Sequence, residues 1–155
     1  MTPEKKYKLV SNSEKEDVDR LVLVWANKFP DIPDNVPLIK YEYFSAKTVG
    51  MSLSSVQGAR ITSRFITGRY RVEYSFEIHY QIEPSGNSDN KRLSAVELLN
   101  QFADWAIANR PELGENRIVL NLEVVNFASY LGATDDRYED YFVPLKLTYE
   151  VITNA

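Results

Sequence analysis

The sequence predicts an α+β fold, in which a mostly antiparallel sheet has two helices packed on one face. The clearest observation is a strict alternation of polar and apolar residues from Arg69 to Ile82. The even positions are all apolar or aromatic: Tyr70, Val72, Tyr74, Phe76, Ile78, Tyr80 and Ile82. The odd positions are all polar, which is the pattern of a long strand with one buried face and one solvent-facing face. Burial on one face only favours an antiparallel sheet that is covered on that face.

Two apolar stripes at helical spacing, one before this strand and one after it, predict the helices. The first stripe follows Ser13 and Glu16, a capping box that marks a helix start. Its members are Val18, Leu21, Val22, Trp25, Ala26 and Phe29. Because Pro30 cannot continue a helix, we expect this helix to run from about Glu14 to Lys28.

The segments around the first helix have weaker patterns. Residues 1–12 are charged, and we expect them to be flexible. Three prolines between positions 30 and 37 predict an extended turn, and Leu38 to Phe44 predicts a short strand. Residues 48–58 are ambiguous between a strand or hairpin and an arm, because apolar residues are spaced there by small polar ones. Ala59 to Thr67 predicts a strand that joins the central one through a bend or bulge at Gly68.

The second helix follows a loop over residues 84–90 that is rich in turn-forming residues. Ser94 and Glu97 form a second capping box, although Asp89 or Asn90 could cap the helix earlier. We expect Pro111 to end this helix. Its inward stripe, with Trp105 beside it, consists of Ala95, Leu98, Leu99, Phe102 and Ala106.

Two closing strands complete the predicted sheet. Between Arg117 and Tyr130 the apolar residues occupy even positions up to Val124 and odd positions from Val125, so we expect a β-bulge there. A polar, acidic loop follows. The last strand alternates again, with Tyr141, Val143, Leu145, Leu147, Tyr149 and Val151 on one phase. Pro144 on the other phase indicates an edge strand or an early strand position.

Length and composition fit one domain over residues 1–155, and 44% hydrophobic with 26% charged residues is ordinary for a globular protein. The absence of cysteine excludes disulfides and thiolate chemistry, and a single histidine excludes a multi-histidine metal centre within one chain. A formal charge of -4 argues against a protein that mainly grips nucleic-acid backbone. No apolar run approaches the ~20 residues of a membrane span, and the N-terminus lacks the apolar core of a signal peptide, so we expect a cytosolic protein.

No pattern in the sequence indicates catalysis. Asp135, Asp136, Glu139 and Asp140 form an acidic cluster that lacks the ligand alternation of a calcium loop, and we interpret it as a solvated loop. His79 has no serine or cysteine at a motif spacing, so we interpret it as a surface or interface histidine. We therefore predict no enzyme, with no catalytic residue, no metal and no cofactor.

Charged residues beside and within the central strand suggest a protein–protein surface. Arg64, Arg69 and Arg71 are followed by Glu73 and Glu77. Arg69 and Arg71 lie on the phase opposite to the tyrosines, which disfavours a nucleic-acid surface that stacks bases beside positive charge. Arginine beside opposite charges instead suits directional ion pairs with a neighbouring protein.

The order of the elements and two short stretches of sequence carry a resemblance to a family. The elements are a capped helix, a proline-rich turn, a strand region with a long arm, a long alternating strand, a second helix and two closing strands. The stretches are VWANKFP (Val24 to Pro30) and LLNQFADW (Leu98 to Trp105). In these features the sequence resembles the small tail-terminator and tail-completion ("minor capsid") proteins of long-tailed bacteriophages, in particular those from Gram-positive hosts.

The resemblance implies a structural virion protein that is assembled in the bacterial host cytoplasm. Members of this family form a six-fold ring on the head-proximal end of the tail tube, stop tube growth and offer a surface for head joining. The implied partners are further copies of the chain, the tail tube protein and a head-completion protein, with no membrane and no sequence-specific nucleic acid. In such a ring, residues 48–58 with Val49, Met51 and Leu53 would be a contact arm. The acidic cluster would line a DNA passage, where like charge keeps DNA from sticking.

Two other classes of protein fit the same sequence. A small cytosolic adaptor or regulatory module of α+β sandwich type would bind a host protein with a fixed, small stoichiometry. A domain that binds a small molecule on its aromatic-rich face would gain thermal stability with added ligand. Self-assembly into a ring would distinguish the tail protein from both.

Overall fold

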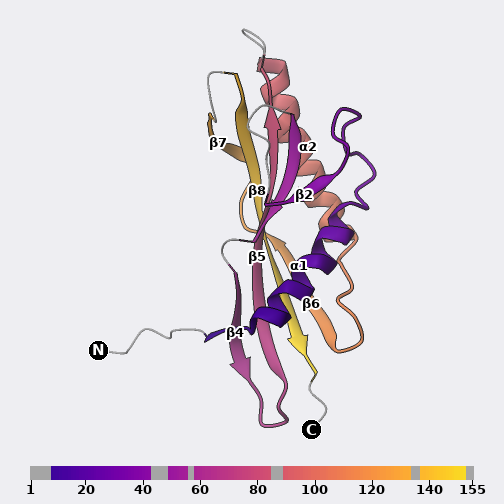
Figure 1. Ribbon diagram of the computed structural model, residues 1–155, viewed down its shortest axis with the longest axis vertical. Helices are drawn as coiled ribbons and strands as arrows, with labels where there is room; N and C mark the ends of the chain where they lie inside the picture. The colour runs from indigo at the N-terminus through magenta and orange to yellow at the C-terminus, as the bar shows by residue number, and fades with distance from the viewer. Residues whose placement is uncertain (1–7, 43–48, 56–57, 85–88, 134–136, 153–155) are drawn as a thin grey trace, which may run out of the picture.

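The computed structural model describes residues 8–42, 49–55, 58–84, 89–133 and 137–152 (Figure 1). Over these residues it has two helices and eight strands in one sheet, so the predicted α+β class is confirmed. The helices are α1 (Asn12–Ala26) and α2 (Asp89–Ala108). The strands are β1 (Lys8–Leu9), β2 (Ile39–Tyr41), β3 (Gly50–Ser54), β4 (Ala59–Arg64), β5 (Tyr70–Ile82), β6 (Arg117–Val124), β7 (Ser129–Ala133) and β8 (Glu139–Val151).

The strands β5 and β8 form the centre of the sheet, as the alternation in β5 predicts. They run antiparallel and pair along their whole length, from Tyr70 opposite Val151 to Ile82 opposite Glu139. The other edge of β5 is shared by β4 and β3, and β1 and β2 lie outside those two strands. The pair β2–β3 is the one parallel pair among the described strands. The far edge of β8 is shared by β6 and β7.

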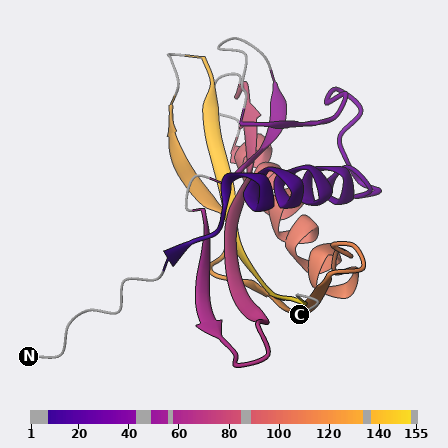
Figure 2. The same ribbon diagram turned by 60° about the horizontal axis from the view of Figure 1, so that its bottom comes forward.

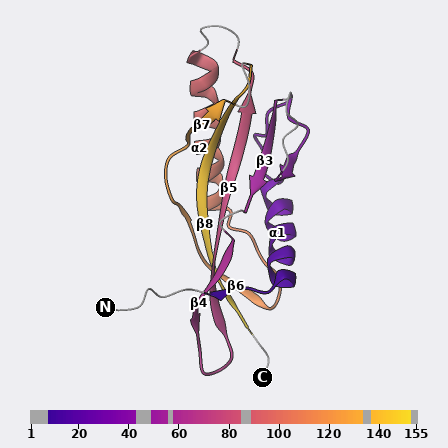
Figure 3. The same cartoon turned by 60° about the vertical axis from the view of Figure 1, so that its left-hand side comes forward.

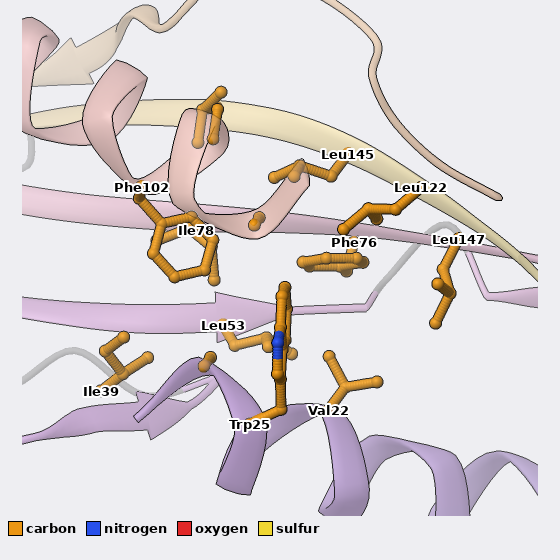
Figure 4. Close-up of a cluster of buried hydrophobic side chains, with 14 of the residues drawn as sticks. Val22, Trp25, Ile39, Leu53, Phe76, Ile78, Phe102, Leu122, Leu145 and Leu147 are labelled. Carbon is orange, nitrogen blue, oxygen red and sulfur yellow. The ribbon is translucent and has the colours of Figure 1, made fainter. Parts of the chain in front are cut away.

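Both helices cover the face of the sheet that carries the even-numbered side chains of β5. The ring centroid of Trp25 on α1 lies 6.2 Å from Phe76 of β5 and 5.9 Å from Phe102 of α2. Figure 4 shows Trp25 pointing from α1 towards Phe76, with Phe102 entering from α2. The predicted stripe residues that are buried are Val18, Val22, Trp25, Ala26, Phe29, Ala95, Leu99, Phe102 and Ala106. Leu21 and Leu98 are partly buried against the same core.

The ends of α1 lie two residues earlier than predicted. Ser11 has an extended backbone, and its hydroxyl accepts a hydrogen bond from the backbone nitrogen of Glu14 at 3.2 Å, so Ser11 is the N-cap and Ser13 is not. At the other end, the side chain of Asn27 donates to the carbonyl of Ile39 and accepts from its amide. Asn27 therefore follows the helix and fastens β2 to it. Helix α2 begins at Asp89, so the predicted capping box of Ser94 and Glu97 is wrong, because both residues lie inside the helix.

Residues 50–54 form an inner strand of the sheet, so of the two predicted alternatives the strand is confirmed and the arm is wrong for this part of the chain. The strand β3 pairs with β5 on one side and with β2 on the other. The predicted flexible segment over 1–12 is also wrong from Lys8 onwards, because Lys8 and Leu9 pair with β4. Both segments are ordered by strands distant in the sequence. Residues 1–7, 48, 56 and 57 lie outside the described part of the chain.

The bulge in β6 lies at Leu120, not at Val124 and Val125. The register with β8 shifts between Val119 and Asn121. Each residue of β6 lies on the same face of the sheet as its partner in β8. The side chains of β6 that face the core therefore have odd numbers before the bulge and even numbers after it. Leu120 and the outward Ile118 remain exposed, although both belong to the predicted inward phase.

Pro144 lies in an inner strand, in contrast to the predicted edge or early position. Its carbonyl accepts a hydrogen bond from the amide of Val125 at 2.9 Å, so its nitrogen faces the β6–β7 side as well. The gap between the end of β6 and the start of β7 falls at this point. A residue without an N–H is tolerated there because no ladder hydrogen bond is required.

The strands β4 and β5 form a hairpin that extends past the body of the molecule, as Figure 2 shows. Gly68 closes its turn with a positive φ of 92°, which confirms the predicted bend at this glycine. Figure 3 shows the same hairpin at the end of the sheet remote from β7. Neither described helix has the length and apolar character needed to cross a membrane.

Candidate assembly surfaces

The face of the sheet away from the helices carries the predicted charged residues of β5. Arg69 and Arg71 approach Glu150 of β8, with nitrogen–oxygen distances of 3.5 and 3.7 Å. Lys146 of β8 lies 3.8 Å from Glu73 and 2.9 Å from a glutamate of β6. Three of the residues that the sequence assigns to a contact with a neighbouring protein, Arg69, Arg71 and Glu73, therefore pair with residues of β8 in the same chain.

One end of this charged face is buried, around His79. Its Nδ1 lies 3.1 Å from Asp140, its Nε2 lies 3.1 Å from Glu77, and its ring stacks on Phe142. His79 and Gln81 are both buried, so the predicted solvent-facing phase is wrong here. Of the two alternatives for His79, an exposed surface position is wrong and an interface position stays a prediction. Burial alone would lower the pKa of His79, but the hydrogen bonds to the two carboxylates outweigh it and raise the pKa to about 9. At neutral pH this histidine is a cation between two carboxylates.

We expect the His79 cluster to lose its stabilising effect at alkaline pH. The pKa of His79 in the folded protein, about 9, lies above the ordinary histidine value of about 6.5. The cluster therefore stabilises the folded state fully below about pH 6.5, and this stabilisation is lost as pH rises through about 9. A loss on the order of 1–3 kcal/mol in unfolding free energy should separate pH 6 from pH 10, and His79→Gln should lack it. Because the sequence has one histidine, its NMR titration measures the pKa directly. A midpoint near 6.5 would contradict this prediction.

Glu139 and Asp140 of the predicted acidic cluster are the first two residues of β8, so the predicted solvated loop is wrong for these two residues. Asp140 is buried and paired with His79, which contradicts a role in lining a passage. Glu139 accepts hydrogen bonds from Nε of Arg92 at 3.0 and 3.2 Å, so its charge is neutralised within the chain. Asp135 and Asp136 lie outside the described residues.

The three apolar interface candidates also have other roles. Met51 and Leu53 are exposed by 1% and 0%, so they belong to the core and cannot contact a neighbour. Val49 is half-buried and lines a groove of about 420 Å³ with Tyr80 and Leu98.

The first exposed apolar surface, which the sequence analysis did not identify, is the turn of the β4–β5 hairpin. We call residues 64–69 the hairpin tip. Ile66 is fully exposed and Phe65 is 41% exposed. Arg71 lies over the ring of Phe65, with 5.7 Å between the guanidinium carbon and the ring centroid. No aspartate or glutamate occurs between residues 58 and 71, so this surface is both apolar and basic. The signal available in the sequence was an isoleucine two residues before the glycine of a turn.

The second exposed apolar surface lies where α2 borders the segment between β6 and β7. Residues at spacings of three and four form one stripe of α2: Leu93, Glu97, Asn100, Asp104 and Ile107. The side chain of Asn100 accepts a hydrogen bond from the amide of Ala128 at 3.0 Å, so the stripe lies beside this segment. The exposed apolar residues are Leu93, Ile107, Val125, Phe127 and Tyr130. We call this surface, with Glu97 and Asp104, the α2 flank. Its apolar residues cannot be distinguished from core residues by their spacing alone.

A buried carboxylate was also missed from the sequence. Asp19 of α1 is 7% exposed and accepts hydrogen bonds from Lys15, Tyr41 and Tyr74. These partners come from α1, β2 and β5, so the cluster joins the helix to the sheet. Over the described ranges, no group of histidine, aspartate and glutamate side chains could hold a metal ion.

The chain has a distant structural neighbour. No family model matches it, and no curated protein matches it. One solved structure, described without a function, is 19% identical, with a TM-score of 0.37 over 96% of this chain and 99% of that chain. A similarity this distant carries no argument about function.

Proposed function

We propose that this protein is a structural component of a bacteriophage tail, which forms a ring, terminates the tail tube and contributes to head–tail joining. The observation that carries the proposal is the pair of different exposed apolar surfaces on one subunit, the hairpin tip and the α2 flank. Contiguous exposed apolar surface on a protein marks a site of interaction. Two different surfaces allow head-to-tail contacts between copies, which form a ring when the rotation closes.

The positions of the two surfaces suit such a contact. The start of β5, next to the hairpin tip, pairs with Val151, and β7, next to the α2 flank, pairs with Phe142. These two residues of β8 are nine positions apart, which corresponds to roughly 30 Å along a strand. Figure 1 shows the hairpin and β7 at opposite ends of the sheet. One subunit can therefore use both surfaces at once.

The order of elements specifies which ring we propose. A capped helix, a proline-rich turn, a long alternating strand, a second helix and closing strands resemble the tail-terminator and tail-completion proteins. Its partners would be other copies of the chain, the tail tube protein and a head-completion protein, brought together in the bacterial host cytoplasm. The two buried charged clusters support a non-catalytic role, because the carboxylates of Asp19 and Asp140 are engaged by groups of the same chain.

The first experiment is a measurement of solution mass by light scattering over a wide range of concentration, with negative-stain images of the same sample. We expect hexamers with a central hole, either free in solution or on the ends of added tail tubes. A mass that stays dimeric at all concentrations would favour the adaptor class. Tail tubes that stay uncapped and continue to grow in the presence of the protein would overturn the proposal.

A further inference from the structure

We propose that the hairpin tip of one copy binds the α2 flank of the next copy, as the repeated contact of the assembly. This inference deepens the proposed ring and rests on it. It assigns the partner of each exposed apolar surface to the other surface of an identical chain.

The hairpin tip combines apolar side chains with the positive charge of Arg64, which has no carboxylate partner among the described residues. Phe65 and Ile66 are exposed at the turn, and Arg64 is exposed beside them. Its guanidinium carbon lies 5.5 Å from the centroid of the Tyr70 ring, and within the described residues it forms no ion pair. The hairpin therefore requires a surface that is apolar at its centre and negatively charged beside it.

The α2 flank has this combination. Phe127 is 80% exposed and Leu93 is 58% exposed. Glu97 and Asp104 are exposed on the same helical stripe, and in the described part of the chain neither carboxylate has an ion-pair partner. The flank thus offers apolar surface and two unpaired negative charges, which complement the tip in both respects.

The placement of the two surfaces excludes a contact within one chain. They lie at opposite ends of the sheet, roughly 30 Å apart along β8. A tip that binds the flank of a second copy leaves that copy's own tip free for a third, so the contact is heterologous. Such a contact forms a closed ring or an open filament, according to the rotation between successive copies.

The absence of cysteine from the sequence allows a direct test of the contact. A variant with Ile66→Cys and Phe127→Cys should form disulfide-linked multimers on mild oxidation, and each single variant should form at most linked dimers. The matched control carries Ile66→Cys and Val24→Cys, where Val24 is 62% exposed on α1. Multimers from the test pair and not from the control pair are expected. Equal linkage in both pairs, or none in the test pair at high protein concentration, would overturn the contact.

Charge exchange provides a second and independent measurement. Arg64→Glu should weaken association at least about tenfold, because like charges then face each other. Glu97→Lys with Asp104→Lys should have the same effect. The chain with all three substitutions should recover association to within about threefold of the original, since opposite charges again face each other with reversed sign. Circular dichroism checks that each variant is folded, and failure of the combined variant to recover while folded would contradict the proposal.

The same variants distinguish the contact from the tail role. If the original protein caps tail tubes but the cysteine pair does not link on those tubes, the contact is wrong and the proposed function stands. If the pair links and the protein fails to cap tubes, the self-contact stands and the tail role is wrong.

Discussion

Replacing Trp25 with alanine should lower the free energy of unfolding by about 3–5 kcal/mol. Trp25 is 7% exposed and lies where α1, α2 and β5 meet. Its ring stacks on Trp105 at 5.2 Å, and its indole nitrogen donates to the carbonyl of Asn109 at 2.6 Å. The substitution would leave a cavity among the aromatic rings and remove this hydrogen bond. Total stabilities of domains are about 5–15 kcal/mol, so the variant would be close to unfolding.

Urea unfolding followed by circular dichroism measures this effect. The matched control is Val24→Ala, the neighbouring position on α1, which is 62% exposed and should change the stability by less than about 0.5 kcal/mol. The midpoint of thermal unfolding of the tryptophan variant should fall by roughly 6–20 °C. If the two variants had equal urea midpoints, Trp25 would not be the side chain that joins the two helices to the sheet.

The sequence predicts these core contacts because they follow local periodicity. The stripes on α1 and α2 and the alternation in β5 depend on the spacing of side chains within one element. The same reasoning fails for β3, since its burial depends on pairs such as Met51 with Tyr80 and Leu53 with Ile78. No spacing within residues 48–58 indicates that β5 lies on one side and β2 on the other. The position of the bulge at Leu120 likewise depends on its register with β8.

The candidate surfaces are harder to predict than the fold for the same reason. Phe127 and Ile66 are apolar, and only the tertiary structure shows that nothing in the described part of the chain covers them. His79 is buried by Asp140, which is 61 residues away in the sequence, and the charges of β5 are paired by β8. Composition and phase predict that this face is charged, but they do not predict which charges remain available to a partner.

Replacing Asp19 with alanine should lower the free energy of unfolding by about 2–5 kcal/mol. Its carboxylate accepts hydrogen bonds from the hydroxyl of Tyr74 at 2.5 Å, the hydroxyl of Tyr41 at 2.7 Å and the amine of Lys15 at 2.9 Å. Alanine would leave these donors without this acceptor in a largely buried site, where an unsatisfied polar group is costly. Asp19→Asn keeps the shape and one oxygen, so we expect a smaller loss of about 1–3 kcal/mol.

The pH dependence distinguishes the charge of Asp19 from its shape. Burial alone would raise the pKa of Asp19, but the hydrogen bonds from Tyr74, Lys15 and Tyr41 outweigh it and hold the pKa below its usual range. The ionised carboxylate of Asp19 therefore stabilises the folded state fully above the unfolded-state pKa of about 3.9. This stabilisation is lost as pH falls through the lower pKa of Asp19 in the folded protein. The gap in stability between the original protein and Asp19→Asn should be full at pH 6 and shrink below about pH 4. Asp31→Asn, an exposed change near the end of α1, is the control. A gap that stays constant from pH 6 to pH 3 would mean that the charge of Asp19 does not stabilise the attachment of α1 to the sheet.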